Sequence, residues 1–229
     1  MTEEEWLGTN PDNFCFDPEP MLSCLQDTPS DRKLRLLAFA SCSLVYERLK
    51  YPQSKKAIEV LGQFTEGLAS AEELAAAAEG AWNAAASWSI GPESPSPDNR
   101  DEWNAFLDEW RLHEAIGWAV TGENRTCSVM DTVIATLIRL DTRWEPCCFI
   151  RCIFGNPFRP VSVNPSWLTS TVVALAEGIY QERAFDRLPI LADALEEAGC
   201  DHADILNHCR EPGEHVRGCW VVDLLTGRT

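Results

Sequence analysis

The sequence has little positive charge for its size. Its 229 residues hold 19 Lys and Arg against 36 Asp and Glu, which gives a formal net charge of −17. A nucleic-acid interface needs clustered Lys and Arg to contact the phosphates, and the chain contains no such cluster. The same shortage disfavours adsorption to an anionic membrane surface. We therefore expect neither a nucleic acid nor a membrane as a partner.

The chain also lacks the segments that direct secretion or span a membrane. Its N-terminus, MTEEEWLGTNPDNF, has neither the basic residues nor the apolar run of a signal peptide. No stretch approaches the ~20 apolar residues of a membrane-spanning helix. These absences predict a cytoplasmic protein, in which thiols stay reduced. The ten cysteines are accordingly expected as buried small side chains, metal ligands or nucleophiles, and not as five disulfides.

Common enzyme signatures are missing as well. The sequence has no GxGxxG, no phosphate-binding loop, no HExxH and no GxSxG. Pairs of acidic residues are frequent, but so acidic a chain produces them by chance. The absence of a catalytic motif favours a protein without catalytic activity over an enzyme.

What the chain does contain is a helical pattern along most of its length. Hydrophobic residues make up 45% of it, a typical value for a globular protein. Apolar residues recur at helical spacing, Ser30 is placed to cap one helix, and Ser70 with Glu73 has capping-box spacing. Leu188, Leu191 and Leu195 share one helical face. The pattern predicts an all-α fold, a multi-helix bundle or array.

Prolines and glycines divide this pattern into regions. The run SIGPESPSPDNRD predicts a loop or linker over 89–100, between an N-terminal helical region, 1–88, and a C-terminal one, 101–229. Helices are expected at 101–119 and 128–141 within the latter. Gly155 and Gly199 are expected to end helices.

Two segments depart from the helical pattern. GNPFRPVSVNPSW contains three prolines and predicts an extended stretch. CWVVDLL predicts a short C-terminal strand because Trp220, Val221 and Val222 have strand character. Four residues of these segments are candidates for contacts with a partner protein: Phe158, Arg159, Trp167 and Trp220.

Several segments also resemble a known family. They are DPEPMLSCLQDTPSDRKLRLLAFASC, EGLASAEELAAAAE, FIRCIFGNPFRPVSVNPSWL, IYQERAFDRLPILADALEEAGCDHADILNHCR and HVRGCWVVDLLTG. Together they are similar to uncharacterised paralogous proteins of planctomycete bacteria, with GNPFRP and HVRGCWVVD as shared signatures. LPILADALEEAG also resembles a repeat-companion domain, with Ala194 in place of its tryptophan. The family has no established activity, so the resemblance implies no chemistry.

Residues 200–223 concentrate the potential metal ligands, with three of the ten cysteines and three of the four histidines. On an intact helix Cys200 and Cys209 stand about 13 Å apart, too far for one ion. His208 and Cys209 are adjacent and point about 100° apart, so only one of them is expected to bind. The remaining candidates for zinc are Cys209, His215 and Cys219, with a fourth ligand from elsewhere, Cys148 or Cys152.

Two other interpretations of this stretch stay open. Cys209 and Cys219 can simply pack as small apolar side chains, with a helix over 201–210 that buries Ile205, Leu206 and Cys209. Alternatively, Cys219 can act as a nucleophile with His215 or His208 and a carboxylate from Asp223 or Asp204.

The sequence thus favours a cytoplasmic helical interaction or adaptor module that binds another protein and needs no cofactor. A zinc-binding protein comes second and a cysteine-dependent enzyme third.

Overall fold

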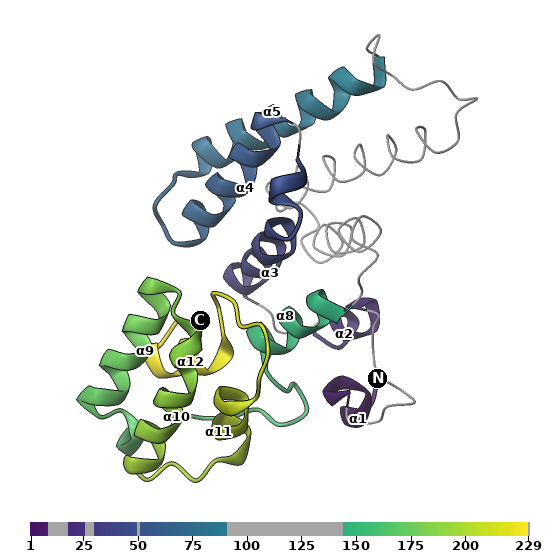
Figure 1. Ribbon diagram of the computed structural model, residues 1–229. Coiled ribbons are helices and arrows are strands. Elements are labelled where there is room, and N and C mark those ends of the chain that lie inside the picture. Colours follow the sequence, from purple (N-terminus) through teal and green to yellow (C-terminus); the bar gives the residue numbers. More distant parts are fainter. Residues whose placement is uncertain (9–17, 26–29, 50, 91–143, 229) are drawn as a thin grey trace. The chain divides into compact units, whose positions relative to one another are not determined.

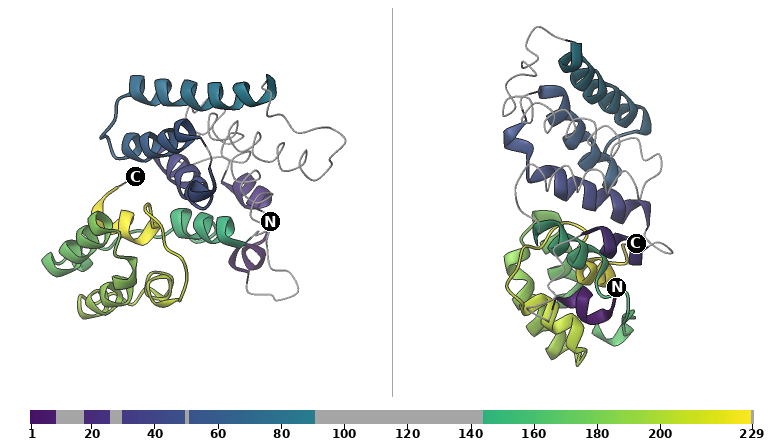
Figure 2. Two further views of the ribbon diagram at one scale, coloured as in Figure 1. Left: turned by 45° about the horizontal axis from the view of Figure 1, so that its top comes forward. Right: turned by 90° about the vertical axis from the view of Figure 1, so that its right-hand side faces the viewer.

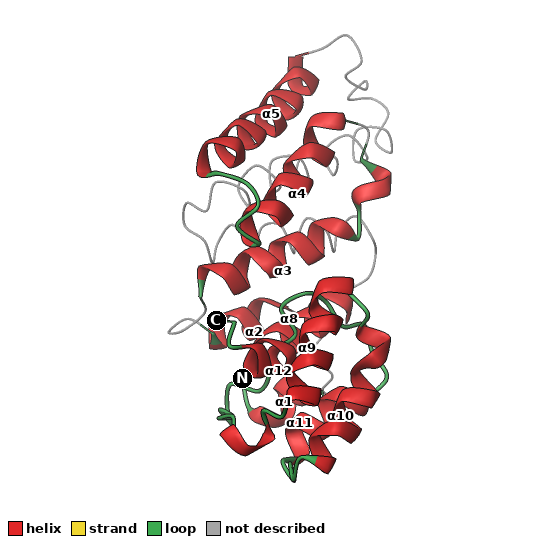
Figure 3. Ribbon diagram, turned by 90° about the vertical axis from the view of Figure 1, so that its left-hand side faces the viewer, coloured by secondary structure: helices red, strands yellow, loops and turns green. Residues whose placement is uncertain are grey.

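The chain folds into helices joined by loops. The structure is a computed structural model and describes residues 1–8, 18–25, 30–49, 51–90 and 144–228. This part contains ten α-helices and no strand, which confirms the all-α prediction (Figures 1 and 3). Within it, no helix is both long enough and apolar enough to cross a membrane. The α-helices are α1 Glu3–Leu7, α2 Pro18–Cys24, α3 Asp31–Ser43, α4 Pro52–Thr65, α5 Ala71–Ile90, α8 Trp144–Phe154, α9 Ser170–Glu182, α10 Leu188–Glu197, α11 Ala203–Arg210 and α12 Trp220–Thr226, with short 3₁₀ turns at Tyr46–Arg48, Pro165–Trp167 and Phe185–Arg187.

The chain divides into two compact units, and these differ from the regions expected from the sequence. One unit joins Met1–Cys15 to Cys147–Thr229, and the other comprises Phe16–Pro146. The first residues thus belong with the C-terminal unit and not with the helices that follow them. The expected loop at 89–100 begins inside α5 and otherwise lies outside the described residues, as do the expected helices at 101–119 and 128–141.

In the unit Phe16–Pro146, helix starts follow the predicted caps. The Ser30 hydroxyl accepts a hydrogen bond from the Lys33 amide at 3.3 Å and begins α3. Ser70 and Glu73 form the reciprocal capping box of α5, since each accepts from the backbone amide of the other. Helix α4 packs against both α3 and α5. A Cβ atom at Gly62 of α4 would lie 2.7 Å from the Phe39 ring of α3, so glycine permits this close approach.

The C-terminal unit is built around α9, α10, α11 and α12 (Figure 2). Leu188, Leu191 and Leu195 of α10 are fully buried, as their shared helical face predicted. Gly155 ends α8 and Gly199 follows α10, both at positive φ, in agreement with their expected roles. The region from Gly155 to Asn164 is not helical, as its prolines required.

The predicted C-terminal strand is wrong, because CWVVDLL forms helix α12. Val221, Val222 and Leu225 are buried, and the spacing between Val221 and Leu225 is one helical turn. Gly227 ends the helix in the left-handed conformation at φ 67°, and α12 packs on α9. Burial of this apolar face outweighs the preference of Trp and Val for strands, which is a weak, context-dependent one.

Helix α1 docks onto the segment that follows α8. Trp6 is buried, and its indole N–H donates to the Gly155 carbonyl oxygen at 3.1 Å. Glu3 Oε1 accepts from Asn156 Nδ2 at 2.7 Å and pairs with Arg159 Nε at 2.6 Å. These contacts explain why residues at the start of the chain belong to the C-terminal unit.

Candidate metal centre

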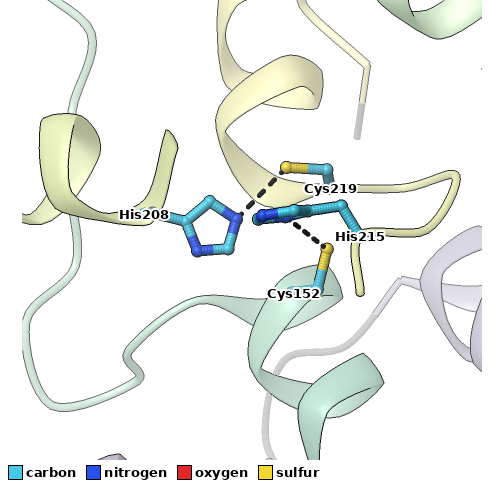
Figure 4. A group of neighbouring side chains, drawn as sticks. All are labelled: Cys152, His208, His215 and Cys219. Carbon is cyan, nitrogen blue, oxygen red and sulfur yellow. Dashed lines mark hydrogen bonds between the residues drawn. The ribbon is translucent and has the colours of Figure 1, made fainter. Parts of the chain in front are cut away.

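Four side chains of the C-terminal unit converge on one point. Cys152, His208, His215 and Cys219 each offer one ligand atom, and these four atoms lie within 4.8 Å of one another. Figure 4 shows the two imidazole rings and the two sulfur atoms pointing toward a common centre.

Three separate parts of the fold supply these side chains. Cys152 lies in the last turn of α8, just before Gly155 turns the chain. His208 lies in the last turn of α11. His215 belongs to the irregular segment that connects α11 to α12, and Cys219 occupies the N-cap position of α12. The group therefore connects α8 to the C-terminal helix pair.

The measured separations are short. His208 Nε2 lies 3.3 Å from Cys219 Sγ, and His215 Nδ1 lies 3.6 Å from Cys152 Sγ. The Val216 amide donates to Cys152 Sγ at 3.5 Å. Both cysteines are buried, with 3% and 0% of their surface exposed, whereas the two histidines are only half-buried. The sulfur atoms thus form the inner side of the group and the imidazole rings the outer side.

Aromatic packing fixes the orientation of the two rings. The His208 and His215 rings meet edge to face, with centroids 4.9 Å apart. The centroids of the Trp220 and His208 rings lie 5.4 Å apart, with the two rings tilted by 53°. A Cβ atom at Gly155 would lie 3.1 Å from the Trp220 ring. The end of α8 therefore contacts the tryptophan that supports a candidate ligand.

The pKa values of the two thiols are shifted in opposite directions. Burial alone would raise the pKa of the Cys219 thiol, but the hydrogen bond from Cys152 and the neighbouring His208 and His215 hold this pKa well below its ordinary value. Burial, followed by the hydrogen bond to Cys219 and the charge of that group, raises the pKa of Cys152. The surroundings therefore favour the deprotonated form at Cys219 more than at Cys152.

The group differs in one member from the ligand set expected from the sequence, because His208 takes the place of Cys209. His215 and Cys219 belong to it, and Cys152 rather than Cys148 supplies the sulfur from α8. Cys209 lies outside it, buried in the hydrophobic core with Ile205 and Leu206, where burial raises the pKa of its thiol. The structure places His208 where the sequence analysis placed Cys209.

A signal in the sequence distinguishes His208 from Cys209. Cys209 follows Ile205 by four residues and so continues the buried face of α11. His208 lies at the edge of that face, where a side chain can reach a neighbouring segment. The periodicity of the helix thus marked Cys209 as a core residue and left His208 available to bind.

The four candidates for partner contacts lie in different surroundings. Phe158 is 42% exposed, and Arg159 pairs with Glu3 while its guanidinium lies 3.9 Å from Asp204. Trp167 is buried in the hydrophobic core of the unit. Trp220 is half-buried between Gly155 and His208. Only the first two present much of their side chains to solvent.

Two of the separations among the four ligand atoms fit a tetrahedral metal site. Bonds of ~2.0 Å to nitrogen and ~2.3 Å to sulfur place neighbouring ligand atoms roughly 3.3–3.8 Å apart. The distances from His208 Nε2 to Cys219 Sγ and from His215 Nδ1 to Cys152 Sγ, 3.3 and 3.6 Å, lie in this range. Comparison of the chain with protein-family models, with curated proteins and with solved structures gives no match. The function must therefore be argued from this group of residues.

Proposed function

We propose that the C-terminal unit binds one Zn²⁺ ion through Cys152, His208, His215 and Cys219. The observation that carries this proposal is the convergence of four ligand atoms within 4.8 Å from three separate parts of the fold. Two thiolates and two imidazoles are a common ligand set for structural zinc. Hydrogen bonds explain why each histidine contacts one cysteine. They do not explain why both pairs meet at one point.

The ligand set favours a structural role over a catalytic one. Catalytic zinc sites keep one coordination position open for water or substrate, whereas structural sites fill all four with protein ligands. Four protein side chains are available here to fill all four positions, and both sulfur atoms are buried. Binding would join α8 to α11 and to the segment between α11 and α12. These elements are far from α8 in the sequence.

Nucleophilic catalysis by Cys219 is a poorer interpretation of the same residues. His208 lies within reach of its sulfur atom, as a catalytic base would. A nucleophile must also be reached by its substrate, and Cys219 has no exposed surface. A catalytic pair of Cys219 and His208, moreover, leaves the Cys152 thiol without a function.

An interaction with another protein is the second candidate function. Phe158 keeps 42% of its surface exposed in the non-helical segment after α8, and the side chain of Arg159 next to it is 58% exposed. An exposed aromatic residue beside an arginine is typical of the residues enriched at interfaces. This role and zinc binding are compatible, since the zinc ligands lie elsewhere in the unit.

Metal content tests the proposal directly. The purified full-length chain is expected to carry one zinc ion, and Co²⁺ in its place is expected to give the absorption of a tetrahedral site with thiolate ligands. A metal at a thousand times its Kd stabilises a fold by about 4 kcal/mol, so a chelator should lower the Tm by roughly 10 °C. Cys24→Ala, at an exposed cysteine, is the matched control and should change neither result.

Absence of stoichiometric zinc, together with no change of Tm on chelation, would refute the proposal.

A further inference from the structure

We propose that Cys152 and Cys219 are a redox pair, and that oxidation by a peroxide replaces the bound zinc ion with a disulfide between them. This inference rests on the proposed zinc site and concerns its regulation. The two cysteines are the only sulfur ligands of the group, and their Sγ atoms lie within 4.8 Å of each other. Thiolates at this separation are within reach of a disulfide after a small movement.

The disulfide would connect the same elements as the zinc ion. Cys152 lies in α8 and Cys219 begins α12, so a covalent bond between them keeps the end of α8 attached to the C-terminal helix. His208 and His215 are not needed for that connection. Oxidation thus replaces the zinc-mediated link with a covalent one. It releases the two histidines from the metal without unfolding the unit.

The chemistry balances with hydrogen peroxide as the oxidant. One thiolate attacks a peroxide oxygen, the O–O bond breaks, and with one proton the products are a sulfenic acid and water. The second thiolate attacks the sulfenic sulfur, and hydroxide leaves and takes a proton to form a second water molecule. Two electrons pass from the two sulfur atoms to the peroxide. The zinc ion leaves because only thiolates, and not disulfide sulfurs, hold it strongly.

Access to the sulfur atoms is through the connecting segment. Residues 211–214 are exposed and not helical, and His215 follows them directly. The half-buried imidazole rings lie on the outer side of the group, with the sulfur atoms behind them. Peroxide therefore reaches the pair when this segment moves outward. We expect oxidation of the pair to be slower than oxidation of the exposed Cys24.

A third thiol makes the choice of pair testable. Burial raises the pKa of the Cys209 thiol, and Cys219 is close enough for its charge to raise this pKa further. Both residues are buried. Cys209 belongs to the same buried core as Cys152 and Cys219, but it supplies no atom to the group. The proposal requires the disulfide to form between Cys152 and Cys219 even though Cys209 lies nearby.

The experiment treats the zinc-loaded full-length chain with hydrogen peroxide and follows three quantities. These are the zinc released to a chromogenic chelator, the free thiols, and the cysteines joined in each peptide after digestion. We expect one Cys152–Cys219 disulfide for every zinc ion released, with both appearing at the same rate. Dithiothreitol with added zinc is expected to restore the starting state, and Cys209→Ala should behave as the natural chain does.

Three results would overturn the proposal. The first is a disulfide from Cys219 to any cysteine other than Cys152, and the second is sulfinic acid as the main product at either residue. The third is zinc that stays bound at a peroxide exposure roughly a hundredfold greater than the one that oxidises Cys24. A chain that holds no zinc before peroxide is added refutes the proposed function instead, so the two failures are distinguishable.

Discussion

His208 and Cys209 are adjacent in α11, and their side chains have different surroundings. The His208 ring contacts the His215 and Trp220 rings, and its Nε2 atom lies 3.3 Å from Cys219 Sγ. Cys209 is 1% exposed and belongs to the hydrophobic core. One residue is therefore positioned to bind a metal, and the other contributes to packing.

Alanine at each position should separate these two roles. His208→Ala removes one of four ligands, and we expect the zinc affinity to fall by more than about a hundredfold, beyond the usual effect of losing a group that merely orients a ligand. Cys209→Ala should keep one zinc ion per chain and cost about 1 kcal/mol of stability through lost packing. Competition with a chelator of known affinity measures the first effect, and urea unfolding measures the second.

Equal losses of zinc affinity in the two variants would contradict this assignment. His202→Gln provides a further control, because His202 is at the other end of α11 and outside the group.

The sequence carries part of this information at the residue scale. It places three potential ligands in one short stretch and identifies His215 and Cys219 correctly as neighbours in space. Cys152 was one of two possible fourth ligands, and the choice between it and Cys148 depends on how α8 is rotated against α11. That rotation follows from tertiary packing and leaves no local signal in the sequence.

At the scale of elements, the junction between α8 and the next segment depends on Gly155. This residue has a φ of 68°, where side chains other than that of glycine are strained. Its Cα also faces the Trp220 ring, which a Cβ atom would approach to 3.1 Å. The glycine was predicted as a helix end, whereas its contact with Trp220 depends on α12 being a helix.

Replacement of this glycine should be costly, and a second glycine provides a matched comparison. We expect Gly155→Ala to lower the stability of the unit by about 1–3 kcal/mol, since it adds both backbone strain and crowding against Trp220. Gly178→Ala, inside α9 with nothing within 4 Å of its Cβ position, should raise stability by about 0.5–1 kcal/mol. Both residues lie in one unit, so the urea midpoints of the zinc-loaded variants can be compared directly.

A Gly155→Ala variant as stable as the natural chain would show that the turn tolerates a side chain.

The failure to predict α12 has a physical cause at the same scale. Trp220, Val221 and Val222 have high strand propensity, and a window of seven residues is too short for helical periodicity to outweigh it. The structure resolves the choice through long-range contacts, since the buried face of α12 packs on α9. The long helices had several turns of periodic sequence each, and they were predicted correctly as elements within the described residues.

At the scale of the molecule, the C-terminal unit is assembled from two distant parts of the sequence. Helix α1 has only five residues, and a helix of that length is not stable alone in water. Its contacts are with the end of α8 and the residues that follow: Arg151 Nε donates to the Trp6 carbonyl, Trp6 to the Gly155 carbonyl, and Glu3 binds Asn156 and Arg159. All four of these partners lie within seven residues of the candidate ligand Cys152.

Removal of the metal is therefore expected to release α1. Without an ion, the end of α8 loses its link to His208, His215 and Cys219, and the surface that holds Trp6 loses its fixed position. We expect the amides of Trp6 and Gly8, which donate to the Thr2 and Glu4 carbonyls, to exchange hydrogen at least about tenfold faster after chelation. Amides of α4, in the other unit, are the internal control and should exchange at an unchanged rate.

A variant in the docked helix tests the direction of this coupling. Trp6→Ala in the zinc-loaded chain should speed exchange in α1 to the same degree, because it removes the only buried side chain of that helix. It should leave the bound zinc in place, since α1 supplies no ligand. If chelation leaves the α1 amides as protected as before while Trp6→Ala exposes them, then α1 is held by its own contacts and the metal does not control it. If both treatments speed exchange equally, the metal site holds the start of the chain through α8, and this helix reports whether zinc is bound.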